Sequence, residues 1–384
     1  MKNSRCLRAV LGLVFLAGVH GCAQVPSSRS DAATFVVDPY WPKPLPNNWI
    51  LGQVAGIAVD TRDHVWIIQR PGSLTDDERG ATLNPPVSKC CVPAPPVMEF
   101  DPEGNLVQAW GGSGQGYDWP SFTGGGFGEH GINIDYKGFV WIAGNGKDDG
   151  QILKFTSKAK FVLQIGRPGP QTGSNDVTRL GGPAGTEVDP EMNEVYVADG
   201  YYNRRIIVFD ADTGAYKRHW GAYGQPPIDS EKITLSRPIP PPAIPSPQFG
   251  NPVHCVHLSH DGLLYVCDRI NNRIQIFRKN GTFVKEFIVE PHTAANGSVW
   301  DLALSTDPQQ RFIYLADGRN NQVLTLLRET GEVVSNFGRP GRYAGEFHWV
   351  HVIAIDSKGN LYTGEVDTGK RVQKFVRGQR LPAQ

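Results

Sequence analysis

Residues 130–142, His-Gly-Ile-Asn-Ile-Asp-Tyr-Lys-Gly-Phe-Val-Trp-Ile, contain the repeat unit that decides the fold of this chain. An apolar strand ends in an aspartate, a tight Asp-x-x-Gly turn follows, and a second apolar strand runs back. The same strand–turn–strand pattern occurs at residues 56–67, 130–142, 184–197, 254–266, 300–315 and 351–362. Each such unit needs neighbours to bury its faces. The sequence therefore predicts an all-β fold, a six-bladed β-propeller.

The repeats predict a single propeller domain over residues 34–384. Its blades are expected at residues 53–112, 130–169, 183–221, 252–289, 299–338 and 348–376. Pro71–Pro96 interrupts the first blade as an insertion, and the Pro-rich segment Gly224–Asn251 separates the third blade from the fourth. Only three strands are clear in the last blade. We expect Thr34–Val37 to supply the fourth, which closes the ring and removes an exposed sheet edge.

The N-terminus is typical of an export signal. Lys2, Arg5 and Arg8 precede the apolar run Ala9–Val19, and Cys22 follows in a box that resembles the lipidation site of bacterial lipoproteins. We therefore predict a signal peptide over residues 1–21, a lipid on Cys22 and a tether over residues 22–33. Ordinary signal cleavage nearby is the alternative. Either way the mature protein is expected to be exported, to the periplasm or the outer cell surface.

Charge and hydropathy exclude several classes of partner. Lys plus Arg and Asp plus Glu both number 38, so the formal net charge is zero and nothing indicates nucleic-acid binding. No run beyond the N-terminus is long and apolar enough to span a membrane. We expect contact with a membrane only through the lipid anchor, a monomeric protein, and a partner that is a small molecule or the end of a peptide.

The cysteines do not form a zinc-ligand pattern. Cys255 and Cys267 are equally distant from Asp261, so they are expected opposite each other in a hairpin. Export permits a disulfide there, but cross-strand geometry often does not, so the sequence leaves their oxidation open. Cys90 and Cys91 are adjacent within the insertion, and their oxidation is equally open. No second pair has the ligand spacing of a CxxC-type zinc site.

Three histidines share one position in the repeat. The residues five positions before each closing Asp or Ser are Ala55, His130, Ala184, His254, Trp300 and His351. In a six-membered ring, His130, His254 and His351 would lie in alternate blades and point at one axial point. Three neutral imidazoles with an open further position are typical of catalytic zinc, although other divalent transition metals also suit them. The alternative is three unrelated histidines, each hydrogen-bonded to its neighbours.

The ends of the second strands return to the same face as these histidines. The residues there are Gln69-Arg70, Gly144-Asn145, Asp199-Gly200-Tyr201, Asp268-Arg269, Asp317-Gly318 and Glu365-Val366. Near a cationic site, positive charge favours the phenolate of Tyr201, which would then act as general base. Arg70 and Arg269 would clamp a carboxylate or stabilise an oxyanion. The alternatives are an aromatic residue that covers the propeller and arginines that serve the blades.

These motifs carry a resemblance. The repeats resemble NHL repeats, and residues 52–375 are similar to the peptidyl-α-hydroxyglycine α-amidating lyases, which are six-bladed NHL propellers. The matching motifs are residues 52–60 with Arg70, His130-Gly131-Ile132, residues 197–206 with Tyr201, Pro252-Val253-His254, residues 268–275 with Arg269, and Val350-His351. The resemblance implies zinc held by the three histidines, Tyr201 as catalytic base, and Arg70 and Arg269 as active-site arginines.

The chain also departs from that family. The third histidine of the lyases is followed by an aspartate that helps to hold a structural calcium ion, whereas Val352 stands here. We therefore do not expect a structural Ca²⁺. Tyr202 and Tyr265 stand where the family has disulfide cysteines. The insertion and the Pro-rich segment are reshaped, which affects the expected substrate more than the expected chemistry.

The leading hypothesis from the sequence is a zinc-dependent lyase. It would cleave the C–N bond of an α-hydroxyglycine, or carbinolamide, substrate to an amide and glyoxylate. One alternative is another metal-dependent hydrolase or lyase that acts on a small molecule. The other is a non-catalytic NHL binding propeller at the cell surface, which has no need of an axial metal.

Overall fold

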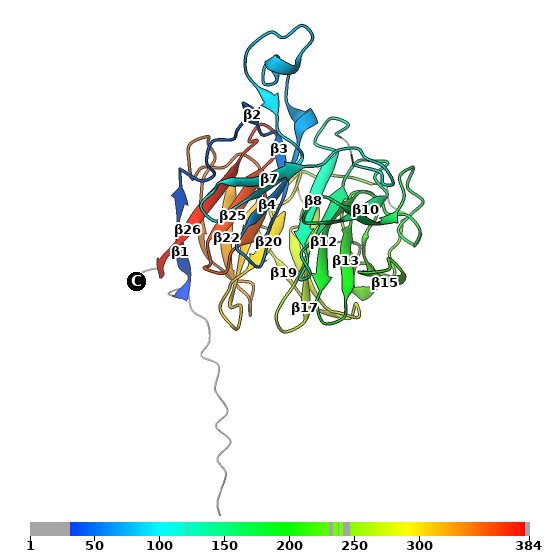
Figure 1. The fold of residues 1–384 in the computed structure, drawn as a ribbon. Helices are drawn as coiled ribbons and strands as arrows, with labels where there is room; N and C mark the ends of the chain where they lie inside the picture. Colours follow the sequence, from blue (N-terminus) through cyan, green and yellow to red (C-terminus); the bar gives the residue numbers. More distant parts are fainter. Residues whose placement is uncertain (1–30, 121, 230–232, 237, 241–245, 381–384) are drawn as a thin grey trace, which may run out of the picture.

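A computed structural model describes residues 31–120, 122–229, 233–236, 238–240 and 246–380. Six four-stranded antiparallel sheets stand around a central axis as the blades of a propeller (Figure 1). The predicted all-β, six-bladed propeller is thereby confirmed. The predicted signal peptide, Cys22 and most of the tether lie outside the described residues.

Within each blade the strands follow one another from the axis to the rim. Blade one contains β3 (Gln53–Val59), β4 (Val65–Arg70), β6 (Val97–Phe100) and β7 (Leu106–Trp110); blade two contains β8 (Glu129–Ile134), β9 (Phe139–Gly144), β10 (Gln151–Thr156) and β11 (Phe161–Gly166). Blade three contains β12 (Pro183–Asp189), β13 (Glu194–Asp199), β14 (Arg205–Asp210) and β15 (Tyr216–Trp220); blade four contains β16 (Val253–Leu258), β17 (Leu263–Asp268), β18 (Arg273–Arg278) and β19 (Phe283–Ile288). Blade five contains β20 (Asp301–Leu304), β21 (Phe312–Asp317), β22 (Gln322–Leu327) and β23 (Val333–Phe337). Blade six contains β24 (Val350–Ile355), β25 (Leu361–Glu365), β26 (Val372–Arg380) and β1 (Ala33–Asp38).

The N-terminal strand closes the ring, as the sequence predicts. β1 pairs with β26 in antiparallel register, with Val37 opposite Phe375. The ring of Phe35 packs between Tyr314 and Phe337, with centroid distances of 5.2 and 5.1 Å. These contacts tie the first strand of the chain to both blade six and blade five.

The blades are held together by apolar clusters between neighbouring sheets. Between blades one and two, Trp66 and Ile68 pack with Ile142. Equivalent clusters join each following pair of blades and, through Val54 and Tyr362, blade six to blade one. Burial of each such side chain contributes about 1.5–3 kcal/mol. A blade alone would leave both faces exposed, so the ring is one cooperative core.

In each strand–turn–strand unit the closing Asp or Ser accepts backbone hydrogen bonds from the turn or from the second strand. In blade two, Asp135 Oδ1 accepts hydrogen bonds from the backbone N–H groups of Lys137 and Phe139, and Oδ2 accepts one from Trp141 Nε1 at 2.9 Å. Gly138 completes the turn at φ +80°, a left-handed conformation that favours glycine. The closing residue thus fixes the turn and, with it, the register between the first and second strands of the unit.

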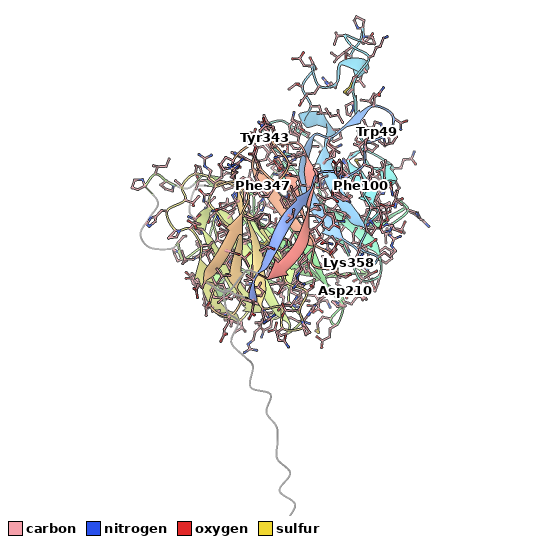
Figure 2. The ribbon with its side chains drawn as sticks, turned by 90° about the vertical axis from the view of Figure 1, so that its left-hand side faces the viewer. Trp49, Phe100, Asp210, Tyr343, Phe347 and Lys358 are labelled. Carbon is pink, nitrogen blue, oxygen red and sulfur yellow. A yellow bond between two sulfur atoms is a disulfide. The ribbon has the colours of Figure 1, made fainter. Side chains whose placement is uncertain are left out.

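The insertion of blade one projects from one face of the ring (Figure 1). It contains the short helices η2 (Pro71–Ser73) and η3 (Gly80–Thr82), and its strand β5 (Val92–Pro93) pairs with β2 (Trp49–Ile50). Figure 2 shows Trp49 at the base of this projection and Lys358 near the opposite face.

Two further short helices, η4 (Ala222–Gly224) and η5 (Arg269–Asn271), lie in loops. None of the helices in the described ranges is long and apolar enough to cross a membrane.

Both cysteine pairs of the described chain form disulfides. Cys255 and Cys267 lie opposite each other in β16 and β17, with a Cα–Cα distance of 4.8 Å. Cys90 and Cys91 are joined within the insertion.

Candidate metal centre

The three histidines of alternate blades meet on the propeller axis. His130 lies on β8, His254 on β16 and His351 on β24, and each is at most 3% exposed. Their ring centroids are 5.0, 4.9 and 4.8 Å apart, which is a nearly equilateral triangle. The alternation of histidine with other residues in the sequence therefore becomes a pseudo-threefold cluster.

The intervening blades fix the orientation of these rings. Nδ1 of His130 donates to the carbonyl of Ala184 at 2.6 Å, and Nδ1 of His254 donates to that of Trp300 at 2.6 Å. Nδ1 of His351 donates to the carbonyl of Ala55 at 2.9 Å. Since Nδ1 carries the proton, Nε2 keeps its lone pair. Ala55, Ala184 and Trp300, which occupy the same repeat position in the intervening blades, thus orient the histidines through their backbone carbonyls.

The three imidazoles are neutral. Burial lowers the pKa of His130 well below its usual value, and the positive charge of Arg70 adds to this effect. Burial also dominates for His254 and His351. Nε2 of His254 is buried without a hydrogen-bond partner, which is costly unless a ligand occupies it. Three neutral, pre-oriented nitrogen donors fit a divalent transition metal.

Tyr201 lies directly against this cluster. It follows β13, is buried, and its hydroxyl donates to Nε2 of His130 at 2.9 Å. Nη1 of Arg269 donates to the same hydroxyl oxygen at 3.5 Å. The guanidinium of Arg269 lies over the ring of Trp300, 4.7 Å from its centroid, and 5.8 Å from that of Tyr201. The phenol oxygen is therefore in contact with both a histidine and a cation.

Arg70 ends β4 and borders the same cluster from blade one. Its Nε donates to the carbonyl of Glu129 at 2.7 Å, Nη1 to Gln53 Oε1 at 2.8 Å, and Nη2 to Asn145 Oδ1 at 3.3 Å. All these acceptors are neutral. Burial lowers the pKa of Arg70 to about 10, so the guanidinium is charged at neutral pH.

Arg70 and Arg269 have no carboxylate within ion-pair distance in the part of the chain that the structure describes. Other buried arginines of the chain differ. Arg205 pairs with Asp199 at 2.8 Å, and the same pairing recurs between Arg273 and Asp268 at 2.7 Å. A buried cation without a counter-charge is costly, and a bound anion would compensate it.

A cavity of about 340 Å³ runs along the axis beside the histidines. Further along it, Nε2 of His257 donates to Asp301 Oδ1 at 2.9 Å, and Glu187 lies 3.7 Å from Nδ1. Burial opposes the charge on His257, but hydrogen bonds to Asp301 and Glu187 outweigh it and raise the pKa to about 10. This charged cluster links blades three, four and five.

The structure brings together all six residues that the sequence places at the site, His130, His254, His351, Tyr201, Arg70 and Arg269. Sequence reasoning did not assign roles to Gln53 and Asn145, which hold Arg70. Asn145 was expected on this face from its place after β9, but nothing in the sequence shows which neighbour it contacts. The His257 cluster was also missed, because it depends on contacts between blades.

Val352 follows the third histidine, where the resemblance leads one to expect a calcium ligand. Its side chain is buried and packs with Val54 and Ile57 in the apolar cluster between blades six and one. An apolar side chain offers no ligand to a hard cation, which prefers oxygen. The expectation of no structural calcium therefore stays a prediction for experiment.

No family model matches the chain. Among curated proteins, it is 28% identical over 341 residues to the mouse peptidyl-glycine alpha-amidating monooxygenase, which covers 85% of this chain and 30% of that protein. It thus spans about a third of the length of that relative. A *Caenorhabditis elegans* protein named "Probable peptidyl-alpha-hydroxyglycine alpha-amidating lyase pgal-1" is 26% identical over 42% of each chain. Human NHL repeat-containing protein 3 is 24% identical over 91% of this chain and 86% of its own length.

Among solved structures, a streptogramin B lyase superposes with a TM-score of 0.52. It is 13% identical in sequence and covers 91% of this chain and 100% of that one. A likeness at this identity shows the propeller fold alone. The homologues thus include amidating enzymes and NHL-repeat proteins, as the sequence motifs indicate.

Proposed function

We propose that this protein is a metal-dependent lyase that cleaves the C–N bond of an α-hydroxyglycine-type substrate, N–CH(OH)–carboxylate. One observation carries the proposal. A neutral three-histidine centre, a phenol hydroxyl 2.9 Å from it and two guanidiniums without carboxylate partners converge at one end of the axis. This set matches a small substrate that has a hydroxyl beside a carboxylate.

The residues divide the work by chemistry. His130, His254 and His351 would hold the metal, for which we propose zinc. A bound metal supplies Lewis acidity at the substrate hydroxyl and does not need to change its oxidation state. Arg70 and Arg269 would bind the substrate carboxylate, because both are buried beside the centre and neither has a carboxylate within ion-pair distance among the described residues.

Tyr201 would move the proton. As phenolate, its oxygen takes the proton from the substrate hydroxyl, the C–O bond becomes a carbonyl, and the electron pair of the C–N bond leaves with nitrogen. The nitrogen then takes that proton. The products are a primary amide and glyoxylate or a related oxo acid, so the step needs no oxidant and no water. Arg269 donates to the phenol oxygen, which stabilises negative charge there.

The relatives support a function connected with peptide amidation. The mouse and *Xenopus laevis* relatives are named as amidating monooxygenases, and the nematode relative as an amidating lyase. The relatives are 28% identical or less, so the specific C–N lyase reaction is our proposal for this chain.

We further propose that the chain acts after export, as a lipid-anchored monomer.

The test is metal analysis followed by an activity assay. Mature protein should contain about one zinc per chain. It should release glyoxylate from α-hydroxyhippurate, with benzamide as the second product. Removing the metal with a chelator should abolish release, and adding zinc back should restore it. A protein that takes up no transition metal would be a binding propeller instead, and the proposal would fail.

A metal-loaded protein that releases no glyoxylate from any carbinolamide would have another metal-dependent activity. Arg70→Ala then separates the alternatives further. Loss of carboxylate binding with metal retained would still assign an acidic substrate to the site.

A further inference from the structure

Buried arginines on the third strands of the blades pair with carboxylates, whereas Arg70 at the end of a second strand contacts neutral acceptors. In blades three, four and six a carboxylate ends or follows the second strand and accepts an N–H from the segment that leads into the first strand. These carboxylates are Asp199, Asp268 and Glu365. Each also pairs with an arginine of its own blade, at 2.8, 2.7 and 2.7 Å.

Amides make this backbone contact in blades one and two. Gln69 stands at the carboxylate position of blade one, whereas Gly144 stands there in blade two and the next residue, Asn145, makes the contact. Gln69 Oε1 accepts the N–H of Gly52 at 2.8 Å, and Asn145 Oδ1 accepts that of Gly128 at 2.9 Å. In these two blades the acceptor of the backbone N–H is therefore neutral. Both amides lie close to Arg70, since Gln69 precedes it in the chain and Asn145 contacts its guanidinium.

Asn145 is the amide that reaches the guanidinium. It is 1% exposed, and its Oδ1 accepts from Arg70 Nη2 at 3.3 Å as well as from Gly128. Its Nδ2 donates to the carbonyl of Gly126 at 3.2 Å. The side chain thus fixes both the guanidinium and the loop beside it.

We propose that Asn145 is a positioning residue that orients Arg70 for an anionic substrate group without placing a carboxylate against the guanidinium. The proposal rests on the proposed function for the identity of that group, a carboxylate. An aspartate at position 145 could keep the backbone contact but would place a carboxylate against the Arg70 guanidinium. The neutral amide orients Arg70 and leaves its guanidinium free to pair with an anion.

The variants Asn145→Asp and Asn145→Ala separate this role from a structural one. Asp keeps the acceptor oxygens for Arg70 and Gly128 but adds a negative charge, whereas Ala removes every side-chain contact and adds none. If Asn145 only holds the loop, anion binding should weaken more in Asn145→Ala. If Asn145 orients Arg70 and keeps it free of a carboxylate, anion binding should weaken more in Asn145→Asp.

The measurement is calorimetric binding of hippurate, which has the carboxylate but no hydroxyl to react, to the metal-loaded full chain. We expect the Kd to rise about tenfold or more in Asn145→Asp and about threefold in Asn145→Ala, with metal content unchanged. Binding of benzamide, which has no carboxylate, should not change in either. Asn336→Asp adds the same charge on the exposed strand β23 and should leave hippurate binding as in the wild type.

The outcomes distinguish the two proposals. Hippurate binding in Asn145→Asp within twofold of wild type would overturn the positioning role, even if the wild-type protein releases glyoxylate. A wild-type protein that binds hippurate and loses this binding in Asn145→Asp, yet cleaves no carbinolamide, would support the positioning role and refute the lyase. A wild-type protein that does not bind hippurate would refute the positioning role, and glyoxylate release would then decide the lyase proposal alone.

Discussion

At the scale of single residues, the centre depends on which nitrogen of each imidazole carries the proton. Backbone carbonyls of Ala55, Ala184 and Trp300 hold the Nδ1 protons, and these residues occupy the histidine position of the intervening blades. Every residue has a backbone carbonyl, so alanine can accept this hydrogen bond as well as tryptophan. Among the six residues at this repeat position, only the side chains of the histidines should affect metal binding.

Single replacement of His130, His254 or His351 by alanine should lower metal content sharply. Each change removes one of three nitrogen donors and leaves an open, buried position. Inductively coupled plasma mass spectrometry of the purified variants measures this directly. His260→Ala, on an exposed turn, is the control and should keep wild-type metal. Wild-type metal content in all three site variants would show that the axial site is wrong.

Tyr201→Phe should reduce turnover by about 10²–10⁴-fold, which is the usual contribution of a general base. Metal content should stay near wild type, because the hydroxyl is not proposed as a ligand. The melting temperature should change little, because phenylalanine keeps the buried ring and loses only the contacts of the hydroxyl with His130 and Arg269. Steady-state rates of glyoxylate release provide the measurement. A variant with unimpaired turnover would remove this mechanism and leave the metal site standing.

At the scale of elements, the first strands of blades three, four and five are linked by the His257 cluster. The pKa of His257 is raised to about 10 by Asp301 and Glu187, against an ordinary value of 6.5. A histidine with a raised folded-state pKa contributes stability that is complete below pH 6.5 and lost as the pH rises toward 10. His257 is partly open to the axial cavity, so solvent screens part of this contribution.

The raised pKa of His257 determines how its contribution to thermal stability depends on pH. Wild type should melt at a higher temperature than His257→Gln at pH 6, and the difference should shrink steadily between pH 7 and pH 10. Thermal melts of both proteins in matched buffers test this. A difference that is constant across this range would mean that His257 contributes packing and not charge.

The closing strand β1 is the other element with an energetic role of its own. Phe35→Ala removes a ring that packs on Tyr314 and Phe337, and should lower the free energy of unfolding by about 2 kcal/mol, less than for a fully buried phenylalanine. Val36→Ala is the matched control, since Val36 is 64% exposed on the same strand. Denaturant unfolding compares them. Equal free energies of unfolding for the two variants would show that the Phe35 contacts of β1 do not stabilise the closed ring.

At the scale of the whole molecule, the ring closes through apolar contacts and β1 without a carboxylate beside His351. Val352 packs into the cluster between blades six and one. Calcium chelation should therefore barely change the melting temperature, since a ligand stabilises a fold only in proportion to its binding. Scanning calorimetry with chelator and with added calcium tests this. A large upward shift on calcium addition would reveal a site made of other oxygens.

The sequence alone determined the propeller and the position of its chemistry. The closing Asp or Ser marks where each first strand ends, so residues at the same distance before it lie at the same depth in the ring. That rule predicts that His130, His254 and His351 converge. It also places Arg70, Tyr201 and Arg269 on the same face, because the second strand must return there. These are consequences of local register and repetition.

Only the tertiary structure decided how those side chains are held and charged. The contact of His351 with Ala55 joins residues 296 positions apart, and that of Arg70 with Asn145 joins residues 75 apart. Such pairs form between blades, where the twist and packing of whole sheets set distances of a few ångströms. No local pattern encodes whether a buried arginine meets an amide or a carboxylate. That difference, which follows from packing between blades, is what leaves Arg70 free to bind an anion.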